Sequence, residues 1–417
     1  MNSDDSPYRR SWRKPLRLTI CGSGNGAHAL AVVASRNPDV EISWLSGTAE
    51  KADKLRRGLA TVGLRSTGAI TGVADRVRTV SSDPAEVIPD ADMVLIVVPA
   101  FGHAAVLRRI EPHLGTSTAI GCVPTRGGFE FDAARLAPGE GSDRRLIFGL
   151  QTLPWSTRVS AIGELVNIGA AKERVVLAAL PSTEAPGIAR RLSDLLGTEI
   201  VPAESFLSLT LGNPGQCIHP GLMYGHFRSW DGEPFDEADI PMFYADATDD
   251  MGELVDRLSR EAIAVAVEIE HRSRGAMKLR EAVVPIHEWL VSTYRHVTGD
   301  TSTVGTCFRT GPIQARKAPV TETRDGRFIP DFGYRYLTED VPYGLVATRA
   351  LAELAEVHTP TIDEVILWSQ TAMQRVYLVD GRLRGRDLRD LPIPQNHGVA
   401  TLSDLTSWYR TGSLLAA

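Results

Sequence analysis

The feature that most constrains this 417-residue sequence is a glycine-rich turn near its start. A short apolar run at 16–20 leads into Cys-Gly-Ser-Gly-Asn-Gly at 21–26, and an alanine- and valine-rich helical segment follows at 27–35. In such a strand–turn–helix unit the first glycine permits the tight turn, and the second lets a diphosphate approach the backbone. A small third residue lets the helix pack on the strand, and the phosphates lie at the helix N-terminus. The sequence therefore predicts a dinucleotide site whose members are Gly22, Ser23, Gly24, Asn25, Gly26 and Ala27.

The first half of the chain alternates short apolar strands with helical segments. Strands are predicted at 16–20, 40–45, 76–80, 93–98, 119–123, 147–150 and 199–202, and helices at 27–35, 49–59 and 186–196. This alternation is typical of βαβ units and a parallel sheet. Residues 164–169 and 174–180 are predicted to add an antiparallel hairpin. We thus expect a polar, disordered tail at 1–14 and a Rossmann-type, doubly wound sheet over 15–203.

The second half lacks this strand rhythm. A long amphipathic helix is predicted at 253–271, with further helices at 286–297, 343–356 and 362–377. Residues 300–331 form a long connection with little periodicity, and such connections are usually functional or mobile. The predicted fold class is therefore α/β, with the sheet domain followed by a mainly α-helical domain at 204–417.

The end of the second predicted strand bears on the choice of cofactor. Trp44-Leu45-Ser46-Gly47-Thr48 places no acid where a carboxylate would bind the ribose 2′-hydroxyl of NADH. Ser46 and Thr48 are instead followed by four basic residues, Lys51, Lys54, Arg56 and Arg57, which favours NADPH. The alternative is that these bases form the solvated face of a helix. Pro99 follows the apolar run 93–98 and is expected at the cofactor crevice.

Composition and charge exclude several classes of protein. With 43% hydrophobic and 23% charged residues the chain has an ordinary globular balance, which rules out wholesale disorder. The net charge is −6 and the sequence has no block of basic residues, so it does not indicate a nucleic-acid-binding surface. No apolar run is long enough to span a membrane, and no secretion signal is recognised. Four widely spaced cysteines predict a reduced, cytoplasmic setting without a disulfide framework or metal cluster.

Two segments of the second half carry the candidate chemistry. His219 stands between a turn-forming run that starts at Asn213 and a Pro-Gly pair, so we expect it on a rigid, concave stretch of backbone, where an imidazole can transfer protons near neutral pH. Arg335 can bind a carboxylate through two parallel hydrogen bonds, and Asp340 can orient an imidazole. The alternative is that Glu339 and Asp340 are acids favoured at a helix N-terminus.

Over nearly its whole length the chain resembles the octopine/opine dehydrogenase family. The segments that carry the resemblance are GSGNGAHALA (22–31), VPTRGGFEFDA (123–133), GLQTLPWSTR (149–158), NPGQCIHPGLMYG (213–225), SWDG (229–232), RYLTEDVPYGL (335–345) and TPTIDEVILWSQ (359–370). The resemblance implies a Rossmann domain followed by a helical substrate domain. It also implies reductive condensation of the amino group of an amino acid with a 2-oxo acid, using NADH or NADPH, by a monomer or a homodimer.

The resemblance also implies roles for individual residues. His219, Arg335 and Asp340 match the catalytic histidine, arginine and aspartate of the family. Arg126 departs from the pattern, because the family often carries glutamine near this position. An arginine there is expected either to bind an additional substrate carboxylate or to act as a structural ion-pair partner. Thr152 and Trp155 resemble substrate-side neighbours.

Other functions remain open from the sequence. One is a different two-domain dehydrogenase, acting on a 2-hydroxy acid or a glycerol phosphate. Another is an NADP-binding sensor without catalysis. A metal hydrolase is disfavoured, because Glu268-Ile269-Glu270-His271 lacks metal-ligand spacing. Oxidation of NAD(P)H that depends strictly on an added amino acid would separate the first alternative from the opine reaction.

Overall fold

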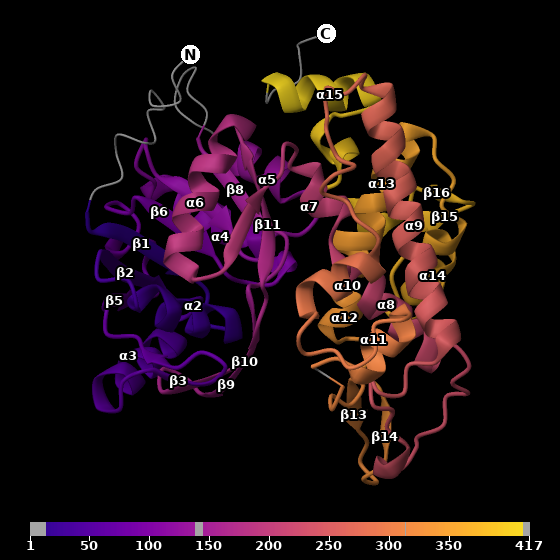
Figure 1. Cartoon of the computed structure of the whole chain (residues 1–417), viewed down its shortest axis with the longest axis horizontal. Coiled ribbons are helices and arrows are strands. Elements are labelled where there is room, and N and C mark those ends of the chain that lie inside the picture. The colour runs from indigo at the N-terminus through magenta and orange to yellow at the C-terminus, as the bar shows by residue number, and fades with distance from the viewer. Residues whose placement is uncertain (1–13, 138–144, 313, 412–417) are drawn as a thin grey trace. The chain divides into compact units, whose positions relative to one another are not determined.

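The computed structural model describes residues 14–137, 145–312 and 314–411. Its contacts divide the chain into two compact units: Met1–Thr125 with Phe129–Leu209, and Arg126–Gly128 with Thr210–Ala417 (Figure 1). This division falls a few residues after the boundary predicted at 203/204, and it assigns the short segment 126–128 to the second unit. Of the tail predicted at 1–14, only Lys14 lies within the described residues.

The first unit is built on an eight-stranded sheet in the order β12-β11-β8-β7-β6-β1-β2-β5. Its strands are β1 (Leu16–Cys21), β2 (Val40–Leu45), β5 (Val77–Ser81), β6 (Met93–Ile96), β7 (Ala119–Cys122), β8 (Ile147–Leu150), β11 (Arg174–Leu180) and β12 (Glu199–Pro202). Neighbours are parallel except β11 and β8. Every residue of β6, β7 and β8 is buried, as expected for the interior of a parallel sheet.

Helices connect the strands of this sheet in the described part of the first unit. They are α2 (Asn25–Ser35), α3 (Ala49–Thr61), α4 (His103–Ile110), α5 (Phe129–Leu136) and α6 (Ala185–Leu196). Helix α2 packs against β1 and β2, whereas α6 packs against β11 and β12. The alternation of strands and helices follows the prediction, and the predicted doubly wound sheet is confirmed.

The hairpin predicted from 164–169 and 174–180 is wrong. The first of these segments lies in β10 (Leu165–Ala171), which pairs with β9 (Trp155–Ala161) and β3 (Arg65–Gly68). With β4 (Gly72–Val73) they form a separate four-stranded sheet, whereas β11 joins the main sheet. The burial patterns explain the difference: β10 alternates, as a strand covered on one face does, while β11 is almost entirely buried.

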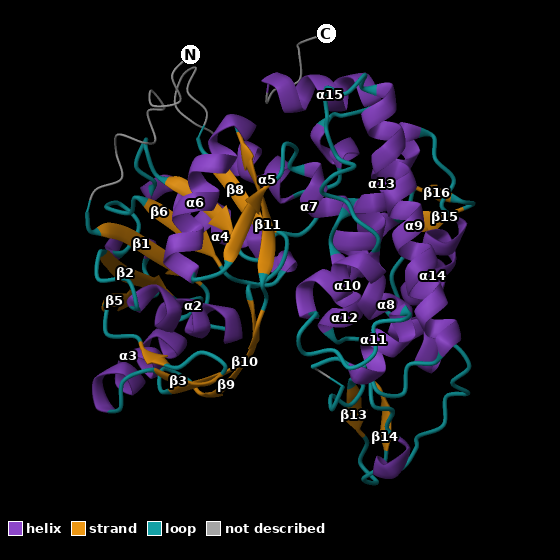
Figure 2. Cartoon of the chain, viewed as in Figure 1, coloured by secondary structure: helices purple, strands orange, loops and turns teal. Residues whose placement is uncertain are grey.

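The second unit is mainly helical, and among its described residues the strands form two small hairpins (Figure 2). Its helices include α8 (Pro214–Phe227), α9 (Asp249–Arg272), α10 (Ile286–Tyr294), α11 (Val304–Thr310), α12 (Arg335–Thr338), α13 (Val346–Ala355), α14 (Pro360–Ala372) and α15 (Leu402–Thr411), while α7 (Leu207–Leu211) spans the division. The hairpins pair β13 (Val320–Glu322) with β14 (Phe328–Pro330) and β15 (Leu378–Val379) with β16 (Arg382–Leu383). Within the described ranges no helix has the length and apolarity needed to cross a membrane.

His219, for which the sequence predicted only a rigid stretch of backbone, lies inside helix α8. The side chain of Asn213 caps this helix by accepting a hydrogen bond from the Gly215 N–H at 3.0 Å, and Pro214 occupies the first turn. Both residues are favoured at a helix start as well as in a turn, so the sequence pattern was ambiguous. Pro220 continues the helix at the cost of one backbone hydrogen bond.

Candidate active site

The glycine turn between β1 and α2 depends on Gly22. Its φ of +131° lies in the region that favours glycine, and a Cβ there would come within 2.3 Å of the Val97 carbonyl oxygen. The turn is held by two further bonds: the Gly22 N–H donates to the Leu45 carbonyl at 2.9 Å, and the Trp44 indole N–H donates to the Gly22 carbonyl at 2.5 Å. The turn is therefore fixed by the ends of two neighbouring strands.

The first turn of helix α2 has no side-chain cap, because its N-cap residue is a glycine. A Cβ built on this N-cap residue, Gly24, would meet nothing within 4 Å. The N–H groups of the first turn are thus accessible to an anion. Gly26 and the fully buried Ala27 allow close packing, since a Cβ on Gly26 would come within 2.9 Å of Leu153. This arrangement fits the diphosphate of NAD(P).

Sequence reasoning missed His28, which follows the glycine motif directly. The Gly24 carbonyl lies 2.9 Å from its Nδ1, and the Gly163 N–H donates to its Nε2 at 3.0 Å. A ring that donates through Nδ1 and accepts through Nε2 is neutral. Burial lowers the pKa of His28, against a smaller opposing effect of the Gly24 carbonyl. His28 therefore joins the glycine turn to the loop between β9 and β10, and Asn25 makes a similar link by accepting from the Val159 N–H at 2.9 Å.

The loop after β2 carries the hydroxyl groups expected from the sequence, and a cation that the sequence did not reveal, Arg109, reaches this loop. Ser46 is fully buried, with its hydroxyl 2.9 Å from that of Ser23. Thr48 caps α3, where Lys54 pairs with Glu50 and Arg56 pairs with Asp53. Arg109 reaches this loop from α4 and donates to the carbonyls of Ser82 at 2.7 Å and Gly47 at 3.4 Å. Pro99 precedes the short turn before α4, and the nearby His103 is buried with its Nε2 3.2 Å from the Val98 carbonyl.

A second polar cluster lies in the second unit around His219. Its Nδ1 lies 2.7 Å from Oδ2 of Asp340, whose side chain is buried. The ring of Tyr336 stacks on the imidazole with a centroid distance of 4.0 Å and an interplanar angle of 14°. The Tyr336 hydroxyl in turn accepts a hydrogen bond from Arg316 at 2.7 Å. The His219 side chain is 22% exposed, and Nε2 bonds to no group among the described residues, so it is available to a substrate.

The carboxylate of Glu339 and two guanidinium groups lie around the His219–Asp340 pair. Arg335 donates from Nε to Glu339 at 2.9 Å. Arg126 places its Nε 3.4 Å from Oδ1 of Asp340 and 3.9 Å from Oε1 of Glu339. Burial alone would raise the pKa of Asp340, but His219, Arg126 and Arg335 outweigh this effect and leave the pKa below its ordinary value. Asp340 is therefore a carboxylate that holds the His219 proton on Nδ1.

Glycine also matters in this second cluster. A Cβ on Gly215 would come within 2.8 Å of Oδ1 of Asp340, so a larger residue there would displace the carboxylate. Sequence reasoning missed Gly215, Tyr336 and Arg316, and it treated Glu339 only as a helix N-terminal acid. Tyr336 and Glu339 flank predicted site residues, which is the only signal that the sequence offers for them.

The remaining predicted residues, Thr152 and Trp155, lie in the first unit. Both are buried, and Trp155, at the start of β9, belongs to the apolar core of that unit. Their predicted substrate-side role stays a prediction. The structure places Arg126, His219, Arg335 and Asp340 together, and it places the glycine turn, Ser46 and Pro99 at the carboxyl ends of β1, β2 and β6.

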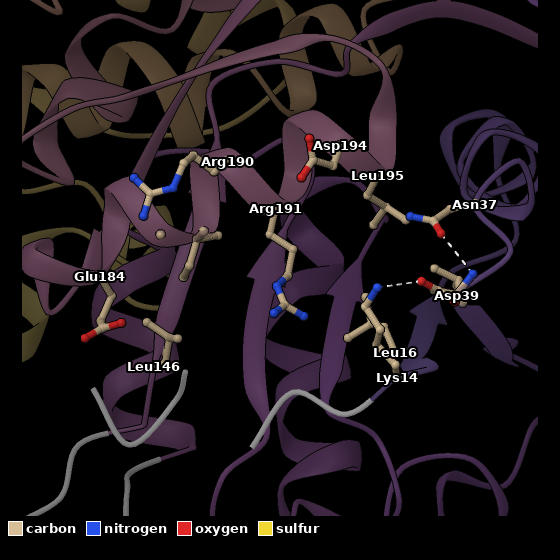
Figure 3. Close-up of a pocket in the computed structure, with 13 residues that line it drawn as sticks. Lys14, Leu16, Asn37, Asp39, Leu146, Glu184, Arg190, Arg191, Asp194 and Leu195 are labelled. Atoms are coloured by element: carbon tan, nitrogen blue, oxygen red, sulfur yellow. Dashed lines mark hydrogen bonds and ion pairs between the residues drawn. The ribbon is translucent and has the colours of Figure 1, made fainter. Parts of the chain in front are cut away.

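A cavity of about 510 Å³ lies elsewhere in the first unit (Figure 3). It is lined by Leu16 and Val40, the first residues of β1 and β2. The cavity therefore lies at the amino-terminal ends of these strands, whereas the glycine turn lies at the carboxyl end of β1. Basic Lys14, Arg190 and Arg191 are balanced by acidic Asp39, Glu184 and Asp194, and Lys14 pairs with Asp39 at 2.9 Å. This cavity is separate from both clusters.

The fold and the two clusters define a two-domain, NAD(P)-dependent dehydrogenase. Comparisons with known proteins agree. Residues 202–373 match the family model described as NAD/NADP octopine/nopaline dehydrogenase, alpha-helical domain. The chain is 31% identical over 398 residues to the tauropine dehydrogenase of Arabella iricolor, covering 93% of this chain and 99% of the relative.

Solved structures of octopine dehydrogenase match over the same extent. One with NADH and L-arginine has a TM-score of 0.83 at 28% identity, and one with NADH and pyruvate has a TM-score of 0.82 at 27% identity. Each match covers 96% of this chain and 99% of the other. The chain belongs to the octopine/opine dehydrogenase family. The expected reaction class, NAD(P)H-dependent reductive condensation of an amino acid with a 2-oxo acid, is confirmed at this level.

Proposed function

We propose that this opine dehydrogenase uses NADPH, and that His219, Asp340 and Arg335 form its catalytic centre. The observation that carries the proposal is the 2.7 Å contact between Nδ1 of His219 and buried Asp340, with Nε2 left to the substrate. The nicotinamide, when bound, supplies the hydride. The protein supplies proton transfer, charge and orientation.

His219 acts in the steps that precede hydride transfer. As the amine adds to the keto carbon, the carbonyl oxygen gains a proton and the amine nitrogen loses one. The resulting hydroxyl gains a second proton and leaves as water, which produces the protonated imine, the cation that accepts the hydride. Nε2 of His219 donates and recovers these protons, and the Asp340 carboxylate stabilises the imidazolium form.

Arg335 is suited to bind the carboxylate of the 2-oxo acid. Its side chain is 45% exposed although its guanidinium is bonded to buried Glu339. Burial would lower the pKa of Arg335, but Glu339 and Asp340 raise it, so the group stays cationic. A planar guanidinium held by one carboxylate can present its remaining donors to another. Solved octopine dehydrogenase structures hold pyruvate and L-arginine, which supports an α-amino acid and a small 2-oxo acid as substrates.

The proposed preference for NADPH rests on the end of β2. No acidic side chain occupies this position, and the Arg109 guanidinium lies beside the Gly47 carbonyl. A carboxylate here would bind a ribose 2′-hydroxyl, whereas a cation accommodates a 2′-phosphate. A Cβ at Gly47 would meet nothing within 4 Å, so an aspartate can be introduced without crowding.

Two variants test this preference. We expect Gly47→Asp to lower kcat/KM for NADPH relative to NADH by at least about tenfold, or about 1.4 kcal/mol. Arg109→Gln should lower kcat/KM for NADPH more than for NADH. The control is Arg108→Gln, which changes an exposed neighbour on the same helix. Equal effects of Gly47→Asp and Arg109→Gln on both cofactors would reject the proposed preference.

The reaction itself is tested by a matrix of amino acids, 2-oxo acids and the two reduced cofactors. We expect oxidation of the cofactor only when an amine and an oxo acid are both present, with mass spectrometry showing the secondary amine product. Turnover with an oxo acid alone would indicate a 2-hydroxy-acid dehydrogenase instead. Binding of NADPH without turnover across the whole matrix would contradict the proposed centre.

A further inference from the structure

We propose that Arg126 is a positioning residue, which keeps Asp340 a carboxylate with its second oxygen fixed and thereby sets the tautomer of His219. The inference rests on the proposed role of His219 and deepens it. It assigns Arg126 to the proton-transfer pair, and it does not assign Arg126 to the substrate.

The geometry divides the two oxygens of Asp340 between two partners. Oδ2 lies 2.7 Å from Nδ1 of His219, and Oδ1 lies 3.4 Å from Nε of Arg126. Oδ1 is also the atom that a Cβ on Gly215 would approach to 2.8 Å, so backbone packing fixes it from a second direction. An aspartate restrained at both oxygens cannot rotate away from the imidazole.

The charge balance of the cluster makes Arg126 necessary. Asp340 and Glu339 are each about 1% exposed, and buried carboxylates are stable only when they are paired. Arg126 and Arg335 supply the two positive charges that cancel them. Without Arg126 one arginine would face two buried carboxylates, and the cluster would bind an additional proton. That proton would bind to the His219–Asp340 pair, because the His219 imidazole is the titratable base that contacts the Asp340 carboxylate.

The two arginines differ in exposure, and this difference separates their roles. The Arg126 side chain is 9% exposed and lies against two carboxylates, while that of Arg335 is 45% exposed. A substrate carboxylate at Arg126 would have to compete with Asp340 and Glu339 inside the protein. Arg335 can meet a substrate while it keeps its bond to Glu339.

The aromatic groups around His219 carry no charge near pH 7. Tyr336 stacks on the imidazole from α12, and its hydroxyl is bonded to Arg316. The pKa of Tyr336 is raised, chiefly by burial, so it stays neutral near pH 7. Phe243 stacks on Tyr336 and its ring centroid lies 6.5 Å from that of His219, and the adjacent Tyr244 also has a pKa raised by burial. The charges nearest to the pair are thus those of Arg126, Arg335 and Glu339.

The test is the protonation of His219, followed by nitrogen-15 NMR in the enzyme without substrates. The His219 signals are assigned by their loss in His219→Asn. Arg126→Gln removes the charge, and Arg126→Lys restores it. Arg349→Gln is a matched control, because Arg349 is also a buried arginine, paired with Asp363 at 2.6 Å and Glu353 at 3.2 Å.

We expect Arg126→Gln to move the titration midpoint of the His219–Asp340 pair to higher pH by about one unit or more. The pH profile of kcat/KM should move in the same direction, with the KM for the oxo acid nearly unchanged. Arg126→Lys and Arg349→Gln should leave the midpoint in place. If Arg126→Gln does not fold, Arg126→Met, which removes the same charge, is expected to show the same shift.

An unshifted midpoint in the charge-removing variant, or an equal shift in Arg349→Gln, would overturn the proposal. A raised KM for the oxo acid with an unshifted midpoint would identify Arg126 as a substrate-carboxylate group. The NMR titration needs no turnover. If the wild-type enzyme fails the substrate matrix while Arg126→Gln shows the shifted midpoint, the proposed function alone is rejected.

Discussion

The two candidate sites of this enzyme are built by different physical means. In the first unit the glycine turn is held by backbone contacts, by Trp44 and by the neutral ring of His28. In the second unit His219 is held by a cluster of buried charges. The first site presents free N–H groups to a diphosphate, and its shape depends on the absence of side chains. The second presents an imidazole whose protonation depends on the identity of side chains around it.

This difference predicts which function fails when each region is altered. Changes in the glycine turn should act on cofactor affinity and on the conformation of the backbone. Changes in the charge cluster should act on proton transfer and on the response to pH. Substitutions in each region therefore separate the two sites.

His219→Ala should have the largest effect on the reaction. We expect kcat to fall by about 10²–10⁴-fold, because the variant loses the group that donates and recovers protons. The Kd for NADPH, measured by calorimetry, should stay within about twofold of the wild-type value. His271→Ala, at a side chain that is 75% exposed on α9, serves as the control. Loss of cofactor binding in His219→Ala would show that the two sites are not separable.

Substitutions at two glycines divide the first site further. Gly22→Ala should lower both stability and cofactor affinity, since left-handed backbone strain alone costs about 1–3 kcal/mol and the Val97 carbonyl lies 2.3 Å from the new Cβ. Gly24→Ala meets no protein atom within 4 Å, so its Tm should change little. The new methyl group would still occupy the approach of the diphosphate and weaken NADPH binding by about tenfold or more. Equal Tm losses in the two variants would contradict this distinction.

Arg335→Gln should act on the oxo acid. Losing a charge-assisted hydrogen bond worth about 1.5–3 kcal/mol corresponds to a rise in the KM for the oxo acid of about 10–100-fold. The KM for NADPH should not move. An unchanged dependence of the rate on oxo-acid concentration would exclude Arg335 as the carboxylate-binding group.

The smallest expected effect is on the pH dependence of stability. The folded-state pKa of Asp340 lies below its unfolded value of about 3.8, so Asp340 stabilises the fold fully above that pH. This contribution is lost as the pH falls through the lower, folded value. In urea titrations the free energy of unfolding of Asp340→Asn should therefore fall less than that of the wild type as the pH is lowered below about 4. An identical acid dependence in wild type and variant would show that Asp340 is not held as a carboxylate by its neighbours.

Much of the fold could be predicted because its determinants are local. The strands at 40–45, 147–150 and 199–202 coincide with β2, β8 and β12, since each is a short segment with β-branched or aromatic residues, bounded by turn or helix signals. The hairpin at 164–180 was predicted wrongly because two adjacent strands looked like partners. In the structure β10 pairs with β9 and β11 pairs with β8. These pairings depend on which face of each strand is buried, and burial depends on the whole sheet.

The glycine turn, the order of the two domains and the residue types needed for chemistry can be read from the amino-acid sequence alone. These follow from contiguous patterns, in which each residue acts on its immediate neighbours. Only the tertiary structure brought Arg126, Gly215, His219, Tyr336 and Asp340 together, because they come from three distant parts of the chain. It also separated the half-exposed Arg335 from the buried Arg126. Exposure and charge balance are properties of the packed cluster, and no local pattern encodes them.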